Sequence, residues 1–168
     1  MSKQRRKGTI LVVDDEQVVR SALSRVLEES GYRVLTAENG EEALGRLQDE
    51  GVGVIISDQH MPGMTGIDLL KLVRVRHPRV VRIMLTGEKD PEVPVRSINE
   101  GEVYRFIRKP RDNANLKTVV SFAFEIARLE QEKRHLITLL RNQIASPQDP
   151  ADVEAEILRL AESEIEEA

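Results

Sequence analysis

The sequence predicts an α/β fold with a doubly wound, five-stranded parallel sheet. Short runs of β-branched and aliphatic residues recur along the chain, and each is followed by a segment whose apolar residues have helical spacing. The connections between these segments are short. Strands and helices that alternate in this way form a parallel sheet with right-handed crossovers.

Composition limits the classes of function. The chain has 168 residues, 40% of them hydrophobic, which is enough for one core and an appendage. It has no Cys, which excludes disulfides, thiolate zinc sites and a cysteine nucleophile. The net charge of −4 argues against nucleic-acid binding by the whole chain, and only the first seven residues are basic. Without a signal peptide or a long apolar run, we expect a cytoplasmic protein with no membrane insertion.

The bounds of the predicted strands and helices follow from the apolar runs and from the residues that interrupt these runs. Gly31 follows the first helical pattern where a helix is expected to end. Asn39 is placed to cap the second helix, and His77-Pro78 closes the third. We expect strands at 9–13, 33–37, 52–57, 80–85 and 103–107. We expect helices at 18–27 and 41–49, from 65 or 66 to 77, near 95–99, and from 112 onward.

The last long helix has an unusual apolar pattern. Apolar residues fall at alternating spacings of three and four, a heptad pattern typical of a coiled coil. The positions are Val119, Phe122, Ile126, Leu129, Leu136 and Leu140, with Lys133 and Gln143 at the two polar positions. Val120, Ala123 and Phe124 are expected to face the sheet. We favour a homodimer through this helix, and a helix folded back on its own domain is the alternative.

These patterns divide the chain into four parts. Residues 1–8 form a flexible basic N-terminus, 9–124 the α/β domain, and 125–145 a helical extension. Residues 146–168 form an acidic tail or helix that begins after the break at Pro147 and Pro150. Acidic runs of this kind are usually solvated, and partner binding is the alternative.

Polar residues follow the predicted strands where each strand ends. Asp14 and Asp15 come after the first strand, Asp58 after the third, Thr86 after the fourth and Lys109 after the fifth. The carboxyl ends of parallel strands lie on one edge of the sheet, so these residues should converge in one pocket. Three neighbouring carboxylates repel one another unless a cation such as Mg²⁺ lies between them.

Lys109 and Thr86 are not needed as metal ligands, but both are suited to contacts with phosphoryl oxygens. The arrangement favours Asp58 as a nucleophile that accepts a phosphoryl group. A structural salt-bridge cluster is the alternative.

With these residues in place, the chain resembles the receiver domain of two-component response regulators over residues 9–124. The segments that carry the resemblance are ILVVDDE, SDQHMPGMTG, MLTG and FIRKP. The resemblance implies a flavodoxin-like fold and a phosphoacceptor at Asp58. It implies Mg²⁺ held by Asp15 and Asp58, by Asp14 through water, and by the backbone carbonyl of His60.

The resemblance also implies residues that respond to the phosphoryl group. Thr86 and Lys109 would contact it, and Phe106 would be the switch aromatic, although the hydroxyl of a switch tyrosine is missing. His60 and Glu88 occupy positions that tune phosphoryl lifetime in the family. The partner would be a histidine kinase or a phosphotransfer protein, with no enzymatic activity beyond phosphorylation and dephosphorylation of Asp58.

Several rival functions are alternatives to this one. The segment 97–106 is similar to receivers that precede cyclic-di-GMP phosphodiesterase domains of the HD-GYP type, so a fragment of such an enzyme is one alternative. A second is an interaction or scaffold module that acts without phosphorylation or an output domain. A DNA-binding regulator would need a basic recognition element, and a phosphatase would need a second catalytic acid; neither is visible.

Overall fold

The computed structural model describes residues 6–49, 51–87, 103–108 and 113–145. The chain consists of two compact units, Met1–Arg128 and Leu129–Ala168. The helix expected near 95–99, the acidic tail at 146–168, and two candidate site residues, Glu88 and Lys109, lie outside the described residues.

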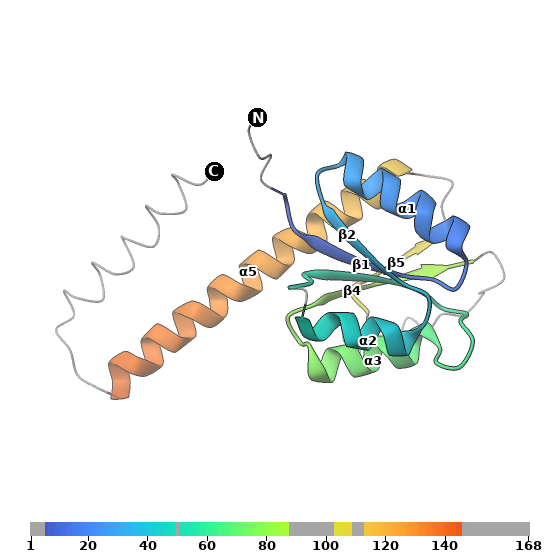
Figure 1. Ribbon diagram of the computed structural model, residues 1–168. Coiled ribbons are helices and arrows are strands. Elements are labelled where there is room, and N and C mark those ends of the chain that lie inside the picture. Colours follow the sequence, from blue (N-terminus) through green and yellow to red (C-terminus); the bar gives the residue numbers. More distant parts are fainter. Residues whose placement is uncertain (1–5, 50, 88–102, 109–112, 146–168) are drawn as a thin grey trace. The chain divides into compact units, whose positions relative to one another are not determined.

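The first unit is built on a parallel sheet with the strand order β2-β1-β3-β4-β5, which confirms the predicted fold class (Figure 1). Its strands are β1 (Thr9–Val13), β2 (Arg33–Ala37), β3 (Val54–Asp58), β4 (Val81–Thr86) and β5 (Arg105–Arg108). The helices are α1 (Gln17–Glu29), α2 (Gly40–Asp49), α3 (Gly66–Arg76) and α5 (Asn113–Ala145).

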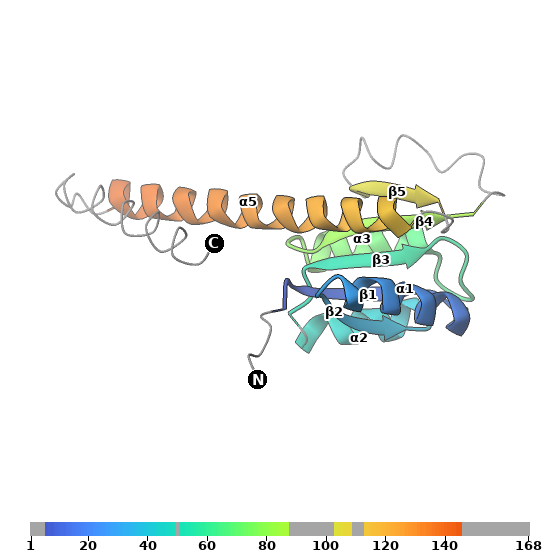
Figure 2. The same ribbon diagram turned by 90° about the horizontal axis from the view of Figure 1, so that it is seen from above.

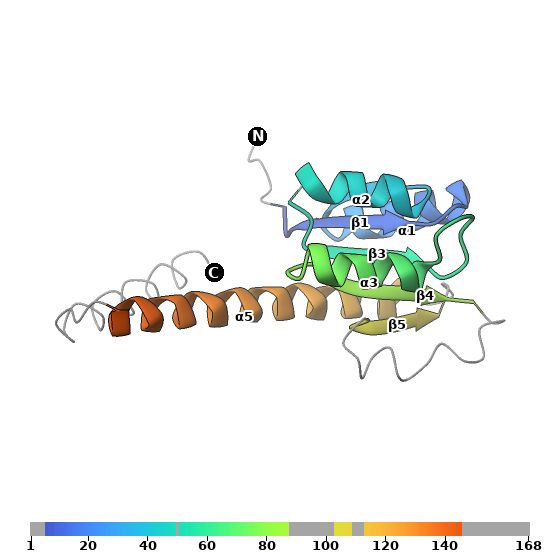
Figure 3. The same cartoon turned by 90° about the horizontal axis from the view of Figure 1, so that it is seen from below.

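Helices cover both faces of the sheet. Figure 2 shows α1 and the beginning of α5 in front of one face, and Figure 3 shows α2 and α3 in front of the other. Side chains of β1 alternate between the two layers: Ile10 and Val12 pack with α1 and α5, whereas Leu11 and Val13 pack with α2 and α3. A strand covered on both faces needs apolar residues at every position, which is why its sequence is a continuous apolar run.

Three strands have different bounds from those expected. The strand expected at 52–57 is β3 (Val54–Asp58), the strand expected at 80–85 is β4 (Val81–Thr86), and the strand expected at 103–107 is β5 (Arg105–Arg108). The partner strands set these limits, because the first paired residues are Ile10 with Val54 and Ile83 with Arg105. Hydrophobicity alone does not reveal where pairing starts, and Val103 is buried without belonging to the strand.

The helix ends follow the expected capping rules with one exception. Asn39 Oδ1 accepts a hydrogen bond from Glu42 N at 2.9 Å, as predicted for the start of α2. Thr65 caps α3, its hydroxyl accepting from Asp68 N. The cap residue of α1, Glu16, makes no side-chain hydrogen bond of this kind, and α1 has no acidic residue in its first turn.

The helix α5 has 33 residues, which confirms the expected long helix. Leu116, Val120 and Ala123 are buried in the core of the first unit. At the positions of the predicted heptad pattern, Val119 and Ile126 are half-buried. The other apolar positions are largely exposed: Phe122 by 61%, Leu129 by 49%, Leu136 by 46% and Leu140 by 54%.

Candidate functional site

The strand order creates a topological switch point between β1 and β3. From β1 the chain passes to β2 on one side and later to β3 on the other, and in such sheets ligands bind outside the carboxyl ends of these two strands. The register pairs Val13 with Ser57 and Asp58 with Leu85, so Asp14 and Asp58 lie level at this edge.

Three carboxylates meet at the switch point, as predicted. Ligand oxygens of Asp14, Asp15 and Asp58 all lie within 4.8 Å of one another. Asp14 is fully buried and Asp58 is 3% exposed, whereas Asp15 is exposed to solvent. Burial makes mutual repulsion of carboxylates costly, and a hard divalent cation with oxygen ligands relieves it. The donor set therefore fits Mg²⁺, and the exposed Asp15 leaves one side of the site open to solvent.

The main chain that carries Asp58 is held by the first turn of α3. Gln59 O accepts a hydrogen bond from Gly66 N at 3.0 Å, and Gln59 Oε1 accepts one from Ile67 N at 3.2 Å. Gly66 is required here, because a Cβ at this position would overlap the carbonyl oxygen of Asp58. Sequence reasoning identified Gly66 only as a possible helix start and missed the role of Gln59.

Three other predicted site residues lie within the described residues: Thr86, Phe106 and His60. Thr86 is the last residue of β4, is 8% exposed, and its hydroxyl donates to Ile107 O at 3.5 Å. Phe106 is half-buried and packs against the core layer formed with α2 and α3. His60 is exposed, two residues after Asp58. The roles assigned to all three remain predictions.

A cavity of about 770 Å³ opens beside Asp15. Its wall comes from the turn after β1, from the loop after β2 with the start of α2, and from the loop after β3. It is lined by Asp15, Glu38, Asn39, Gly40, Glu41, Pro62, Gly63 and Met64.

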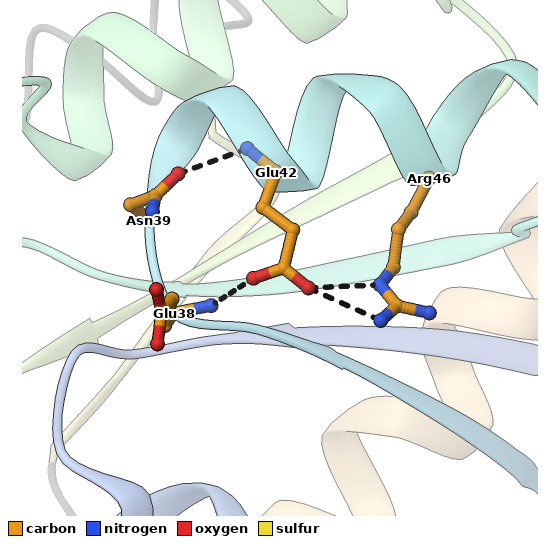
Figure 4. Close-up of polar contacts among 4 residues, drawn as sticks. All are labelled: Glu38, Asn39, Glu42 and Arg46. Atoms are coloured by element: carbon orange, nitrogen blue, oxygen red, sulfur yellow. Dashed lines mark hydrogen bonds and ion pairs between the residues drawn. The ribbon is translucent and has the colours of Figure 1, made fainter.

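Hydrogen bonds at the start of α2 fix one wall of this cavity (Figure 4). Glu42 accepts from Glu38 N at 2.9 Å and from the Arg46 guanidinium at 3.1 Å. The bond from Glu38 N, together with the Arg46 and Arg20 charges, lowers the pKa of Glu42.

One contact at the acidic site was missed by sequence reasoning. Arg20 Nη1 donates to the main-chain carbonyl oxygens of Asp14 at 2.6 Å and of Asp15 at 3.0 Å. In addition, Asp14 Oδ1 accepts from Glu16 N at 2.9 Å. The signal in the sequence was a cation in the first turn of a helix, where the helix dipole disfavours it.

Among the described residues, no helix combines the length and the apolar character needed to cross a bilayer.

Comparison with known proteins agrees with this geometry. The profile of the response regulator receiver domain family matches residues 10–121. The hydrogenase transcriptional regulatory protein HoxA of Cupriavidus necator is 40% identical over 136 residues, which cover 81% of this chain and 28% of HoxA. The DNA-binding transcriptional regulator NtrC of Salmonella typhimurium is 33% identical over 77% of this chain and 28% of NtrC. The chain thus spans little more than a quarter of these relatives.

Solved structures give the same result. The signal receiver domain of an HD domain-containing protein from Pseudomonas fluorescens is 33% identical, with a TM-score of 0.70 over 79% of this chain and 97% of that one. This neighbour agrees with the predicted similarity to receivers that precede HD-type domains. The response regulator TrrA of Thermotoga maritima, solved in complex with Mg²⁺-BeF, is 32% identical, with a TM-score of 0.63 over 69% of this chain and 98% of TrrA. The chain belongs to the receiver domain family of two-component response regulators.

Proposed function

We propose that the chain accepts a phosphoryl group on Asp58 from a histidine kinase or a phosphotransfer protein, in a reaction that depends on Mg²⁺. The observation that carries this proposal is the cluster of Asp14, Asp15 and Asp58 at the switch point of the sheet. Receiver domains as a family are phosphoacceptors with an acidic Mg²⁺ pocket, and the proposal assigns these properties to particular residues.

Each residue has a distinct part in the proposed reaction. A carboxylate oxygen of Asp58 attacks phosphorus, a new P–O bond forms, and the P–N bond to the donor imidazole breaks with its electron pair returning to nitrogen. Asp15, Asp58 and the carbonyl of His60 would hold the cation directly, and Asp14 would do so through water. When bound, Mg²⁺ neutralises charge on the phosphoryl oxygens.

Two further residues would contact the phosphoryl group directly. Thr86 lies at the end of β4, so its hydroxyl would turn from Ile107 O to a phosphoryl oxygen. Lys109, which follows β5 directly in the sequence, would supply the cationic contact. Phe106 would repack as Thr86 moves, and side chains at His60 and Glu88 would set how quickly water removes the phosphoryl group.

The test is incubation with a small phosphoryl donor and Mg²⁺, followed by intact mass measurement. We expect wild type to gain the mass of one phosphoryl group and Asp58→Asn to gain none. Chelation of Mg²⁺ should abolish the gain. Equal labelling of Asp58→Asn would refute the assignment of the phosphoacceptor.

We also propose that the output passes through α5 as a homodimer. The heptad pattern continues along the helix, and Phe122, Leu129, Leu136 and Leu140 are about half exposed or more. A second copy of the same helix would cover these side chains, and burying one leucine contributes about 1.5–3 kcal/mol. Lys133, whose ammonium lies 3.9 Å from Glu130, would lower the stability of the coiled coil.

Leu136→Lys tests the dimer, and Gln131→Lys is the matched control because Gln131 is an exposed polar residue on the same helix. We expect sedimentation to show a dimer for wild type and the control, and a monomer for Leu136→Lys. Beryllofluoride with Mg²⁺ should shift the dimer equilibrium of wild type but not of Asp58→Asn. If beryllofluoride with Mg²⁺ does not change the sedimentation mass of wild type, the alternative function is favoured, in which the chain is an interaction module that works without phosphorylation.

A further inference from the structure

Arg20 is the fourth residue of α1, and its side chain extends back past the start of that helix. Its Nη1 donates to the carbonyl oxygens of Asp14 and Asp15 at 2.6 and 3.0 Å. These two residues carry the carboxylates that meet Asp58. A single charged nitrogen therefore holds the main chain at both acidic positions, and hydrogen bonds from a charged donor are stronger than neutral ones.

The start of α1 differs from the starts of α2 and α3. Asn39 and Thr65 cap those two helices, whereas Glu16 makes no side-chain cap bond. An arginine in the first turn is disfavoured by the helix dipole. The two hydrogen bonds to the carbonyl oxygens explain why an arginine is found there. They fix the turn between β1 and α1, where α1 has no side-chain cap.

The two acids differ in how the fold holds them. Asp14 is fully buried, and its N–H donates to Ala37 O of the neighbouring strand at 3.2 Å. Asp15 is exposed and lies one residue further from the sheet, so the bond from Arg20 ties its main chain to α1. Mg²⁺ demands nearly ideal octahedral geometry, which makes the position of Asp15 relative to Asp58 critical.

We propose that Arg20 is a positioning residue for the acidic site: it holds the main chain at Asp14 and Asp15 so that their carboxylates are placed with Asp58 to receive a divalent cation. The proposal rests on the proposed Mg²⁺ site. Two effects of Arg20 on cation binding have opposite signs. Its positive charge repels Mg²⁺, whereas its hydrogen bonds prepare the ligands. If positioning dominates, removal of Arg20 weakens Mg²⁺ binding even though a repelling charge has gone.

The experiment measures binding of Mg²⁺ alone by calorimetric titration, without a phosphoryl donor. Arg20→Met removes the donors and keeps side-chain length and helix propensity, and Arg20→Lys keeps the positive charge but loses the guanidinium. Arg25→Met is the control, because Arg25 is exposed on the same helix and its loss changes the net charge equally. We expect Arg20→Met to bind Mg²⁺ about tenfold more weakly, the usual effect of losing a residue that orients metal ligands. Arg20→Lys should restore little, and Arg25→Met should match wild type.

Amide hydrogen exchange without Mg²⁺ gives a second readout. The amides of residues 15–17 should exchange faster in both Arg20 variants, while those of β1 keep the wild-type rate and report an intact fold. Equal or tighter Mg²⁺ binding by Arg20→Met overturns the proposal, as does full restoration by Arg20→Lys, since the guanidinium and its two hydrogen bonds would then not be needed for Mg²⁺ binding. If Arg20→Met is unfolded, Arg20→Lys decides by the same criteria. Absence of Mg²⁺ binding by both wild type and Arg25→Met would instead refute the proposed Mg²⁺ site.

Discussion

Substitution of Gly66 by alanine should lower the stability of the fold and slow the phosphorylation proposed for Asp58. The added Cβ would overlap the carbonyl oxygen of Asp58, and it would lie 2.9 Å from the carbonyl carbon of Asp58 and 3.0 Å from Gln59 Cα. Carbon atoms in contact are about 3.5–4.0 Å apart, so the end of β3 and the first turn of α3 must separate by roughly 1 Å. The atoms that the added Cβ would meet all belong to the main chain, so no flexible side chain can move aside to make room for it.

The magnitude follows from two terms. Overpacking of this kind costs about 1–3 kcal/mol. The separation also weakens the bonds from Gly66 N and Ile67 N to Gln59, each contributing about 0.5–1.5 kcal/mol. We therefore expect a loss of about 3 kcal/mol in the free energy of unfolding. A displacement of about 1 Å at a reacting group should slow phosphorylation of Asp58 by about a hundredfold.

Gly45→Ala is the matched control. Gly45 lies inside α2, and a Cβ there would meet nothing within 4 Å. Alanine in a helix interior is more stable than glycine by about 0.5–1 kcal/mol, so the same substitution should raise stability at this position. Urea unfolding followed by circular dichroism measures stability, and intact mass over time measures phosphorylation. If Gly66→Ala unfolds at the wild-type urea midpoint and is phosphorylated at the wild-type rate, the close approach of α3 to Asp58 is refuted.

Three further substitutions test the supports of the fold. The lowered pKa of Glu42 means that its contribution is present at neutral pH and is lost as pH falls through that pKa. Glu42→Gln should therefore reduce stability by roughly 0.5 kcal/mol at neutral pH and by nothing in acid, measured by urea unfolding at both pH values. Thr65→Ala removes the α3 cap and should cost about 1 kcal/mol, and a wild-type midpoint would refute this. Phe124→Leu removes the stacking on Tyr32, with ring centroids 5.0 Å apart, and should lower the melting temperature through a loss of about 1 kcal/mol.

The sheet and the acidic cluster were accessible from the sequence because both depend on local patterns. A strand covered on both faces is rich in apolar residues, and the runs Ile10–Val13 of β1 and Val54–Ile56 of β3 show this directly. The carboxyl ends of parallel strands share one edge, so Asp14, Asp15 and Asp58 could be placed together without coordinates.

The features that sequence reasoning missed depend on contacts made after folding. Whether Arg20 extends into solvent or back to two carbonyl oxygens is set by the conformation of the turn before α1, which no residue pattern specifies. The same holds for Gln59, because its side-chain oxygen can accept a hydrogen bond from Ile67 N only when α3 begins beside it. The bounds of β5 differ from the prediction because pairing with β4 decides them.

The ring of Phe124, which belongs to α5, lies far from the acidic site that contains Asp58. Its ring approaches Gly8 and Gly53, which directly precede β1 and β3, and a Cβ at Gly53 would lie 2.8 Å from Phe124 Cε1. The ring is therefore at the amino edge of the sheet, about 15 Å from the carboxyl edge by the length of a five-residue strand. Variants at Phe124 should change how α5 is anchored without changing the rate of the phosphorylation proposed for Asp58. If α5 carries the output as proposed, such a variant would keep phosphorylation and lose the output.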